Sequence, residues 1–120
     1  MSEYDLEDRL LDYAARIVRL TDELPPTRAG SHVAGQLLRS GTSALGVHGE
    51  AQGAESRNDF VHKFSIGLKE LKESRRWLRL IIKSALIAPV SRVQPLLEET
   101  EELICIFAAS IKTARKRVER

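Results

Sequence analysis

At 120 residues the chain has the length of one ordinary domain, which can bury roughly two-thirds of its unfolded surface without disulfide bonds or metal ions. Its composition, 42% hydrophobic and 30% charged, is typical of a globular protein, and no stretch approaches the ~20 apolar residues that span a bilayer. Residues 1–5 lack the basic and apolar segments of a signal peptide, and the single cysteine, Cys105, has no partner for an intramolecular bridge. We therefore expect one cytoplasmic domain, residues 1–120, without membrane association.

Charge is distributed unevenly along the chain. The net charge is only +2, but residues 1–60 carry six Lys/Arg against ten Asp/Glu, whereas residues 61–120 carry thirteen against seven. Such asymmetry can indicate an anionic partner, or it can let one half of a bundle or one subunit attract another. Composition alone favours the second explanation.

The first predicted helix covers residues 6–24. Its apolar positions follow alternating steps of four and three, which places them on one side of a helix. They are Leu6, Leu10, Tyr13, Ile17, Leu20 and Leu24. Pro25 and Pro26 end this helix, because proline lacks an amide hydrogen and disfavours helical geometry in the residue before it. Thr27, or alternatively Ser31, is expected to cap the next helix.

The second segment, residues 28–55, combines a helical apolar face with many glycines. The apolar positions are Val33, Leu37, Leu38, Ala44, Leu45, Val47 and Ala51, and the glycines are Gly30, Gly35, Gly41, Gly46, Gly49 and Gly53. Each interior glycine costs about 0.5–1 kcal/mol relative to alanine. Close approach to a neighbouring helix is the usual physical reason for such a composition, so we expect a tightly packed central helix.

A third helix is predicted from a cap at Ser56 or Asn58 to about Ala85. Its inward face is expected to hold Phe60, Phe64, Gly67, Leu71, Ser74, Leu78, Ile81 and Ala85. The apolar residues Ile66, Leu68, Trp77 and Ile82 fall outside that face. A helix that is apolar on more than one side has a second surface to cover, and we therefore predict an oligomer interface at Trp77, Ile66 and Ile82.

The last helix is expected to follow the break at Ala88 and Pro89. Ser91 is its predicted cap, and Pro95 fits because it lies within the first turn. The predicted core face holds Val93, Leu97, Leu103, Ile104, Phe107, Ile111, Ala114 and Val118. Four such helices joined by short turns pack most simply as an all-α, antiparallel up-down-up-down bundle.

The candidate catalytic and metal-binding residues are weak. Glu55, Asp59 and His62 lie at helical spacing, but the other helices offer no second Glu-x-x-His motif, so we expect no metal. Neither His48 nor His32 is expected to act as a ligand or base. Cys105 sits among aliphatic residues and is expected to be a buried small hydrophobe. We therefore predict a protein that is not an enzyme and has no cofactor.

Two groups of basic residues are more informative. Lys72, Arg76, Arg79 and Lys83 follow steps of four, three and four, with Lys69 and Arg75 beside them. This row can be a solvated face neutralised by Glu70 and Glu73 at helical spacing, or it can contact the phosphates of a nucleic acid. The second group, at the end of the last helix, is explained by the helix dipole alone. It comprises Lys112, Arg115, Lys116, Arg117 and Arg120.

Several short motifs resemble a known family. They are residues 36–44 (QLLRSGTSA), Glu50-Ala51-Gln52, Ala54-Glu55-Ser56, Asp59-Phe60, His62-Lys63, Leu68-Lys69-Glu70 and Trp77-Leu78. Over residues 33–82 the chain is similar to the four-helix bundle proteins associated with intervening sequences of bacterial 23S ribosomal RNA genes. It departs from the family where Val47 replaces a common asparagine and Leu45 a usual glycine.

The resemblance implies a bundle that assembles into a homo-oligomeric ring, typically a pentamer, without catalytic residues. A related branch, the accessory proteins of diversity-generating retroelements, forms a basic pentamer that binds nucleic acid and a reverse transcriptase. Our leading hypothesis is therefore a non-enzymatic homo-oligomer that contacts RNA or DNA through Lys72, Arg75, Arg76, Arg79 and Lys83. The alternative is a scaffold that binds only protein, a reverse transcriptase or another partner, through the Trp77 side of the third helix.

Overall fold

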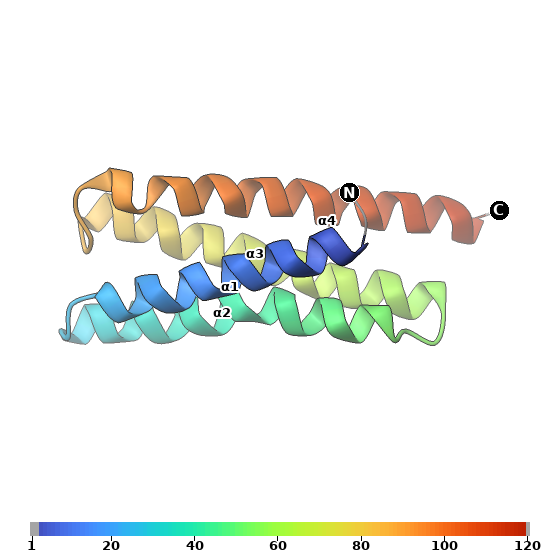
Figure 1. Cartoon of the computed structure of the whole chain (residues 1–120), viewed down its shortest axis with the longest axis horizontal. Helices are drawn as coiled ribbons and strands as arrows, with labels where there is room; N and C mark the ends of the chain where they lie inside the picture. The colour runs from blue at the N-terminus through green and yellow to red at the C-terminus, as the bar shows by residue number, and fades with distance from the viewer. Residues whose placement is uncertain (1–2, 120) are drawn as a thin grey trace.

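Four α-helices make up the computed structural model, which describes residues 3–119, and the side chains of residues 5–117 (Figure 1). The helices are α1 (Glu3–Glu23), α2 (Arg28–Gln52), α3 (Arg57–Ser84) and α4 (Gln94–Glu119), with a short 3₁₀ turn, η1 (Val90–Arg92), before the last. No strand occurs within residues 3–119. The predicted all-α class and the four helices are confirmed, while Arg120 of the basic group and the side chain of Val118 lie outside the described part.

Consecutive helices run in opposite directions and are joined at alternate ends of a bundle that measures 51 × 21 × 21 Å (Figure 1). Helix α1 is the shortest, with 21 residues against 25 to 28 for the others. It begins part-way along the bundle, so the α2–α3 turn and the C-terminal part of α4 extend beyond it (Figure 1). Among the described helices, none is both long enough and apolar enough to cross a membrane.

The starts of α2 and α3 confirm two predicted caps. The Thr27 hydroxyl accepts a hydrogen bond from the Gly30 amide at 3.1 Å, and the Ser56 hydroxyl accepts one from the Asp59 amide at 3.0 Å. The predicted cap at Ser91 is wrong. That residue lies inside η1, where backbone bonds such as Val93 N to Val90 O satisfy the amides that a capping side chain would otherwise bind.

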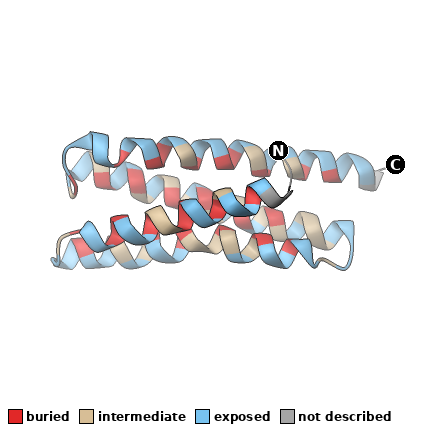
Figure 2. Ribbon diagram, in the orientation of Figure 1, coloured by how far each residue is buried: buried red, intermediate tan, exposed pale blue. Residues whose placement is uncertain are grey.

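The buried residues follow the predicted faces closely (Figure 2). All six apolar positions predicted for α1 are buried.

Three residues that were predicted to be buried are exposed. Leu38 is 42% exposed because its neighbour Leu37 occupies the core side of α2. Ala85 is exposed because the helix ends at Ser84 and Ala85 turns to a left-handed φ of 55°. Cys105 is exposed, since Ile104 and Phe107 hold the core face of α4 and Cys105 points away from it.

Two glycines permit close contact between helices. A Cβ atom on Gly41 would lie 2.6 Å from the side chain of Ile17 in α1, and one on Gly67 would lie 2.5 Å from the ring of Phe107 in α4. These distances are too short for any real carbon pair, so larger residues would push the helices apart. The tight packing expected of residues 28–55 therefore holds at Gly41, but a Cβ atom on Gly35, Gly46 or Gly49 would meet open space.

Candidate nucleic-acid interface

The predicted row of cations lies on one side of α3. Lys72, Arg76, Arg79 and Lys83 are exposed and Arg75 is half-buried. None of these five side chains forms an ion pair with another described residue. The row therefore presents positive charge to solvent without local neutralisation.

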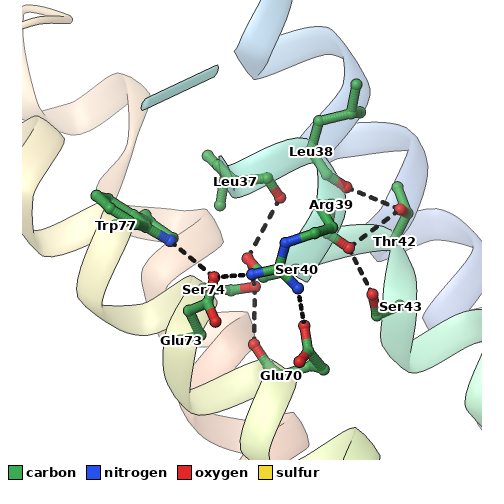
Figure 3. Close-up of polar contacts among 10 residues, drawn as sticks. All are labelled: Leu37, Leu38, Arg39, Ser40, Thr42, Ser43, Glu70, Glu73, Ser74 and Trp77. Atoms are coloured by element: carbon green, nitrogen blue, oxygen red, sulfur yellow. Dashed lines mark hydrogen bonds and ion pairs between the residues drawn. The ribbon is translucent and has the colours of Figure 1, made fainter. Parts of the chain in front are cut away.

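The carboxylates expected to neutralise this row instead face α2 (Figure 3). Arg39 of α2 donates to the Glu70 carboxylate at 2.8 Å and also binds Glu73. The Trp77 indole donates a further hydrogen bond to Glu73 at 3.1 Å. The alternative in which Glu70 and Glu73 neutralise the row is thus wrong, because the two carboxylates bind Arg39 across the α2–α3 contact.

Two grooves between α3 and α4 extend the row of cations. The first has a volume of about 680 Å³ and is lined by Arg76, Arg79, Leu80, Ile82, Lys83, Gln94 and Leu97. The second has a volume of about 420 Å³ and is lined by Ser65, Leu68, Ala108, Ile111, Lys112, Arg115 and Lys116. Ser65 and Arg79 are fourteen residues, or about four helical turns, apart, so both grooves open on the same side of α3.

The antiparallel pairing of α3 and α4 therefore unites two groups of cations that are distant in the sequence. We call the combined set the basic surface, and it consists of Lys72, Arg76, Arg79, Lys83, Lys112, Arg115 and Lys116. At about 1.5 Å per residue, the stretch from Ser65 to Lys83 is about 27 Å long. From the sequence, the helix dipole alone explained the cations at the end of α4, and their position beside α3 was missed. The antiparallel order of the helices could have indicated that position.

The three residues predicted for an oligomer interface do not lie together. Trp77 is half-buried on the α2 side, where its ring meets His32 edge-on with centroids 6.0 Å apart. Ile66 is 36% exposed, and its eleven-residue separation from Trp77 places it on the same side of α3. Ile82 lines the groove toward α4. An interface role for these residues stays a prediction.

The residues that carry the family resemblance hold α2 against α3. The hydroxyls of Ser40 and Ser74 are both buried and lie 2.8 Å apart in a hydrogen bond (Figure 3). Arg39, next to Ser40, makes the contacts to Glu70 and Glu73 described above. The motif residues at these positions are therefore explained by helix packing.

Polar contacts also join α1 to α4. The buried Tyr13 hydroxyl lies 2.7 Å from that of Thr100, and burial raises the pKa of Tyr13 to about 12. Arg9 binds Glu99 with hydrogen bonds of 2.8 and 2.6 Å, and this contact holds the pKa of Glu99 below its usual value. A further bond of 3.2 Å links Arg9 to Glu102. These contacts fix the position of α1 along α4.

His48 is the other buried ionisable residue near α1. It is 1% exposed and packs edge-on against Phe64 with ring centroids 6.0 Å apart. Its Nε2 atom lies 3.2 Å from the Gln52 amide nitrogen, and its Nδ1 atom lies 3.5 Å from Glu7 without a hydrogen bond. In the described part of the chain no three metal-ligating side chains come together, those of Glu55, Asp59 and His62 included.

Comparison with known proteins identifies the family. A family model described as 23S rRNA-intervening sequence protein matches residues 3–109. The chain belongs to this family. It is also similar to the crystal structure of a protein of unknown function from the S23 ribosomal protein family of Bacteroides thetaiotaomicron VPI-5482.

The two chains share 34% sequence identity over 88% of this chain and 97% of the other, with a TM-score of 0.82. No curated protein matches the chain. The family resemblance expected from the sequence motifs is confirmed.

Proposed function

We propose that this member of the 23S rRNA-intervening sequence family is a non-enzymatic protein that binds RNA or DNA phosphates through the basic surface. The observation that carries the proposal is the gathering of seven cations from α3 and α4 on one side of the bundle, none of them in an ion pair with a described residue. Cations placed along a nucleic-acid backbone release condensed counterions, which is the main source of affinity that does not depend on sequence.

The length of the basic surface suits several phosphates. A duplex presents one phosphate about every 3.4 Å per strand along its axis, and the surface extends for about 27 Å. If about five cations contact phosphates, the logarithm of the binding constant should fall with the logarithm of salt concentration with a slope of about −4 to −5.

The test compares two double variants of equal charge change. Lys72→Glu with Arg79→Glu should abolish binding of a labelled duplex RNA or DNA in a salt titration followed by fluorescence anisotropy. Arg19→Glu with Arg28→Glu changes exposed cations of α1 and α2 by the same amount and should retain most of the affinity. Absent binding at low salt, or binding that does not depend on salt, would contradict the proposal.

We also propose that the chain forms a homo-oligomer, with the pentameric ring that the family resemblance implies as the expected assembly. Several large apolar side chains support association, since Leu11, Val18, Leu38 and Leu80 are 42 to 55% exposed. Size-exclusion chromatography with light scattering, recorded together with absorbance at 260 and 280 nm, measures both the mass of the assembly and any co-purified nucleic acid.

A second candidate function is a protein-binding scaffold, favoured by the half-buried Trp77, whose ring meets the exposed His32, and by the exposed Ile66 three turns away on the same side of α3. Aromatic residues of this kind are enriched at protein interfaces. A reverse transcriptase is one partner that the related retroelement proteins suggest. Trp77→Glu should then abolish partner capture but leave the salt-dependent binding of nucleic acid unchanged, and the reverse result would exclude this role for Trp77.

A further inference from the structure

A groove is lined by the end of α2, the start of α3 and the second half of α4. In this region these helices extend beyond the N-terminal end of α1 (Figure 1). None of residues 5–23 of α1, the part of this helix whose side chains the structure describes, lines this end groove. Its walls carry small side chains such as Ala51, Ala109 and Ala114, together with the larger Phe60 and Ile106. Small side chains allow another helix to approach closely, so the groove is open at the position that a fourth helix occupies elsewhere in the bundle.

The size and charge of the end groove restrict what can fill it. Its volume is about 820 Å³. A helix about 10 Å across fills such a volume with about seven residues, or two turns. Two exposed arginines, Arg57 at the start of α3 and Arg117 near the end of α4, line the groove. The lining also includes the polar side chains of Gln52, Ser56, Ser110 and Thr113. The groove therefore suits a helical ridge that carries both apolar side chains and carboxylates.

Helix α1 of this chain carries such a ridge on its outer side. Leu11 is 55% exposed and Val18 is 42% exposed, and they lie seven residues, or about 10.5 Å, apart. The exposed carboxylates of Asp8 and Asp22 lie three residues before Leu11 and four after Val18, with Ala15 between the two aliphatic residues. Steps of three and four place all five side chains on one face, separate from the buried face of α1.

We propose that the α1 ridge, residues 8–22, of one copy docks into the end groove of a second copy. The apolar part of the ridge is about two turns long, which the groove volume can hold, and its carboxylates complement the positive charge of Arg57 and Arg117. Each copy has one ridge and one groove, so the contact is head-to-tail and adds copies in one direction until the assembly closes. This inference rests on the proposed homo-oligomer and leaves the basic surface free for nucleic acid.

Two variants that each destroy one half of the contact test this proposal. The ridge variant is Leu11→Lys with Val18→Lys, and the groove variant is Arg57→Glu with Arg117→Glu. All four residues are exposed in the isolated chain, so circular dichroism should show the helix content and cooperative melting of the original protein. Light scattering should show an oligomer for the original protein and a monomer for each variant.

The equimolar mixture of the two variants is the decisive sample. The groove variant keeps its ridge and the ridge variant keeps its groove, so one contact forms and the mixture should contain a 1:1 dimer that cannot grow. Val90→Lys, which introduces a charge at a 46% exposed position in η1, is the matched control and should leave the mass of the oligomer unchanged.

Three results would overturn the proposal. They are a monomeric original protein at its highest soluble concentration, oligomers that persist in either variant, and two monomeric variants that give no dimer when mixed. Binding of duplex nucleic acid is measured on the same samples. Because the variants leave the basic surface intact, loss of assembly with retained binding separates this inference from the proposed nucleic-acid function.

Discussion

Glycine and serine residues set the closest approach between helices. Gly41 faces Ile17 of α1, Gly67 faces Phe107 of α4, and Ser40 meets Ser74 where α2 contacts α3. At these positions the neighbouring helix leaves space only for a small side chain. Gly46 has the opposite environment, because a Cβ atom added to it would contact nothing.

A pair of alanine substitutions should therefore change stability in opposite directions. Gly46→Ala should raise the free energy of unfolding by about 0.5–1 kcal/mol through helix propensity alone. Gly67→Ala gains the same helix propensity but forces a methyl group against the buried Phe107 ring. The free energy of unfolding should therefore fall by about 1–2 kcal/mol. Urea unfolding with an unchanged m-value measures both, and equal effects would contradict the packing described for α3 and α4.

Tyr13 should make the fold sensitive to alkaline pH. Its folded pKa of about 12 lies above the unfolded value of about 10, so the protonated side chain stabilises the fold fully below pH 10. That contribution is lost as the pH rises through 12, and two pKa units correspond to about 2–3 kcal/mol. The difference in unfolding free energy between the original protein and Tyr13→Phe should shrink by about this amount between pH 9 and 12. A constant difference would show that the phenol does not titrate with folding.

At the scale of the helix, periodicity and capping predicted most of the fold. The regular steps of three and four identified the buried face of α1, and the local chemistry of Thr27 and Ser56 fixed two helix starts. Each failure has its own local cause. Ser91 was misjudged because tight-turn backbone bonds replaced a side-chain cap, and Cys105 because one step along a helix rotates a residue by about 100°, away from the core.

The candidate site was less predictable than the fold, because it depends on which helices are neighbours. The spacing of the α3 cations was visible in the sequence, but the side on which Glu70 and Glu73 would be neutralised was not. Likewise, the α4 cations join those of α3 only through antiparallel packing, which unites residues such as Leu68 and Ile111 in one groove. Sequence spacing along one helix carries no information about its partner.

Two serines near the starts of helices should respond differently to substitution. Ser56→Ala removes the hydrogen bond to the Asp59 amide and should lower the free energy of unfolding by about 1 kcal/mol. Ser91→Ala removes an exposed hydroxyl that caps nothing and should change stability by less than about 0.5 kcal/mol. Thermal unfolding of the two variants side by side gives the comparison, and a larger loss for Ser91 would restore it as a cap.

On the scale of the whole molecule, the bundle separates its charges. Acidic side chains predominate in the first half of the chain, and the unpaired cations of α3 and α4 gather on one side. A ligand that contacts the full length of the basic surface must contact both helices at once. The two grooves, one near each end of that surface, can therefore be tested separately.

Single neutralising substitutions at the two ends should have equal effects on the salt dependence of binding. Lys83→Gln and Lys112→Gln are 29 residues apart in sequence but belong to the same surface. Each should reduce the slope of log binding constant against log salt by about 1 if one nucleic acid contacts both residues. If only Lys83→Gln changes the slope, the nucleic acid contacts only the groove between α3 and the start of α4.

Trp77, the single tryptophan of the chain, makes the α2–α3 contact visible to fluorescence. Its indole donates a hydrogen bond to Glu73 and its ring lies against His32, on the α2 side of α3, whereas the row of cations borders the grooves toward α4. Its emission should therefore shift when α3 separates from α2 and should change little when a ligand binds to the basic surface. An optical signal native to the chain thus distinguishes unfolding of the bundle from occupation of its surface, without any attached label.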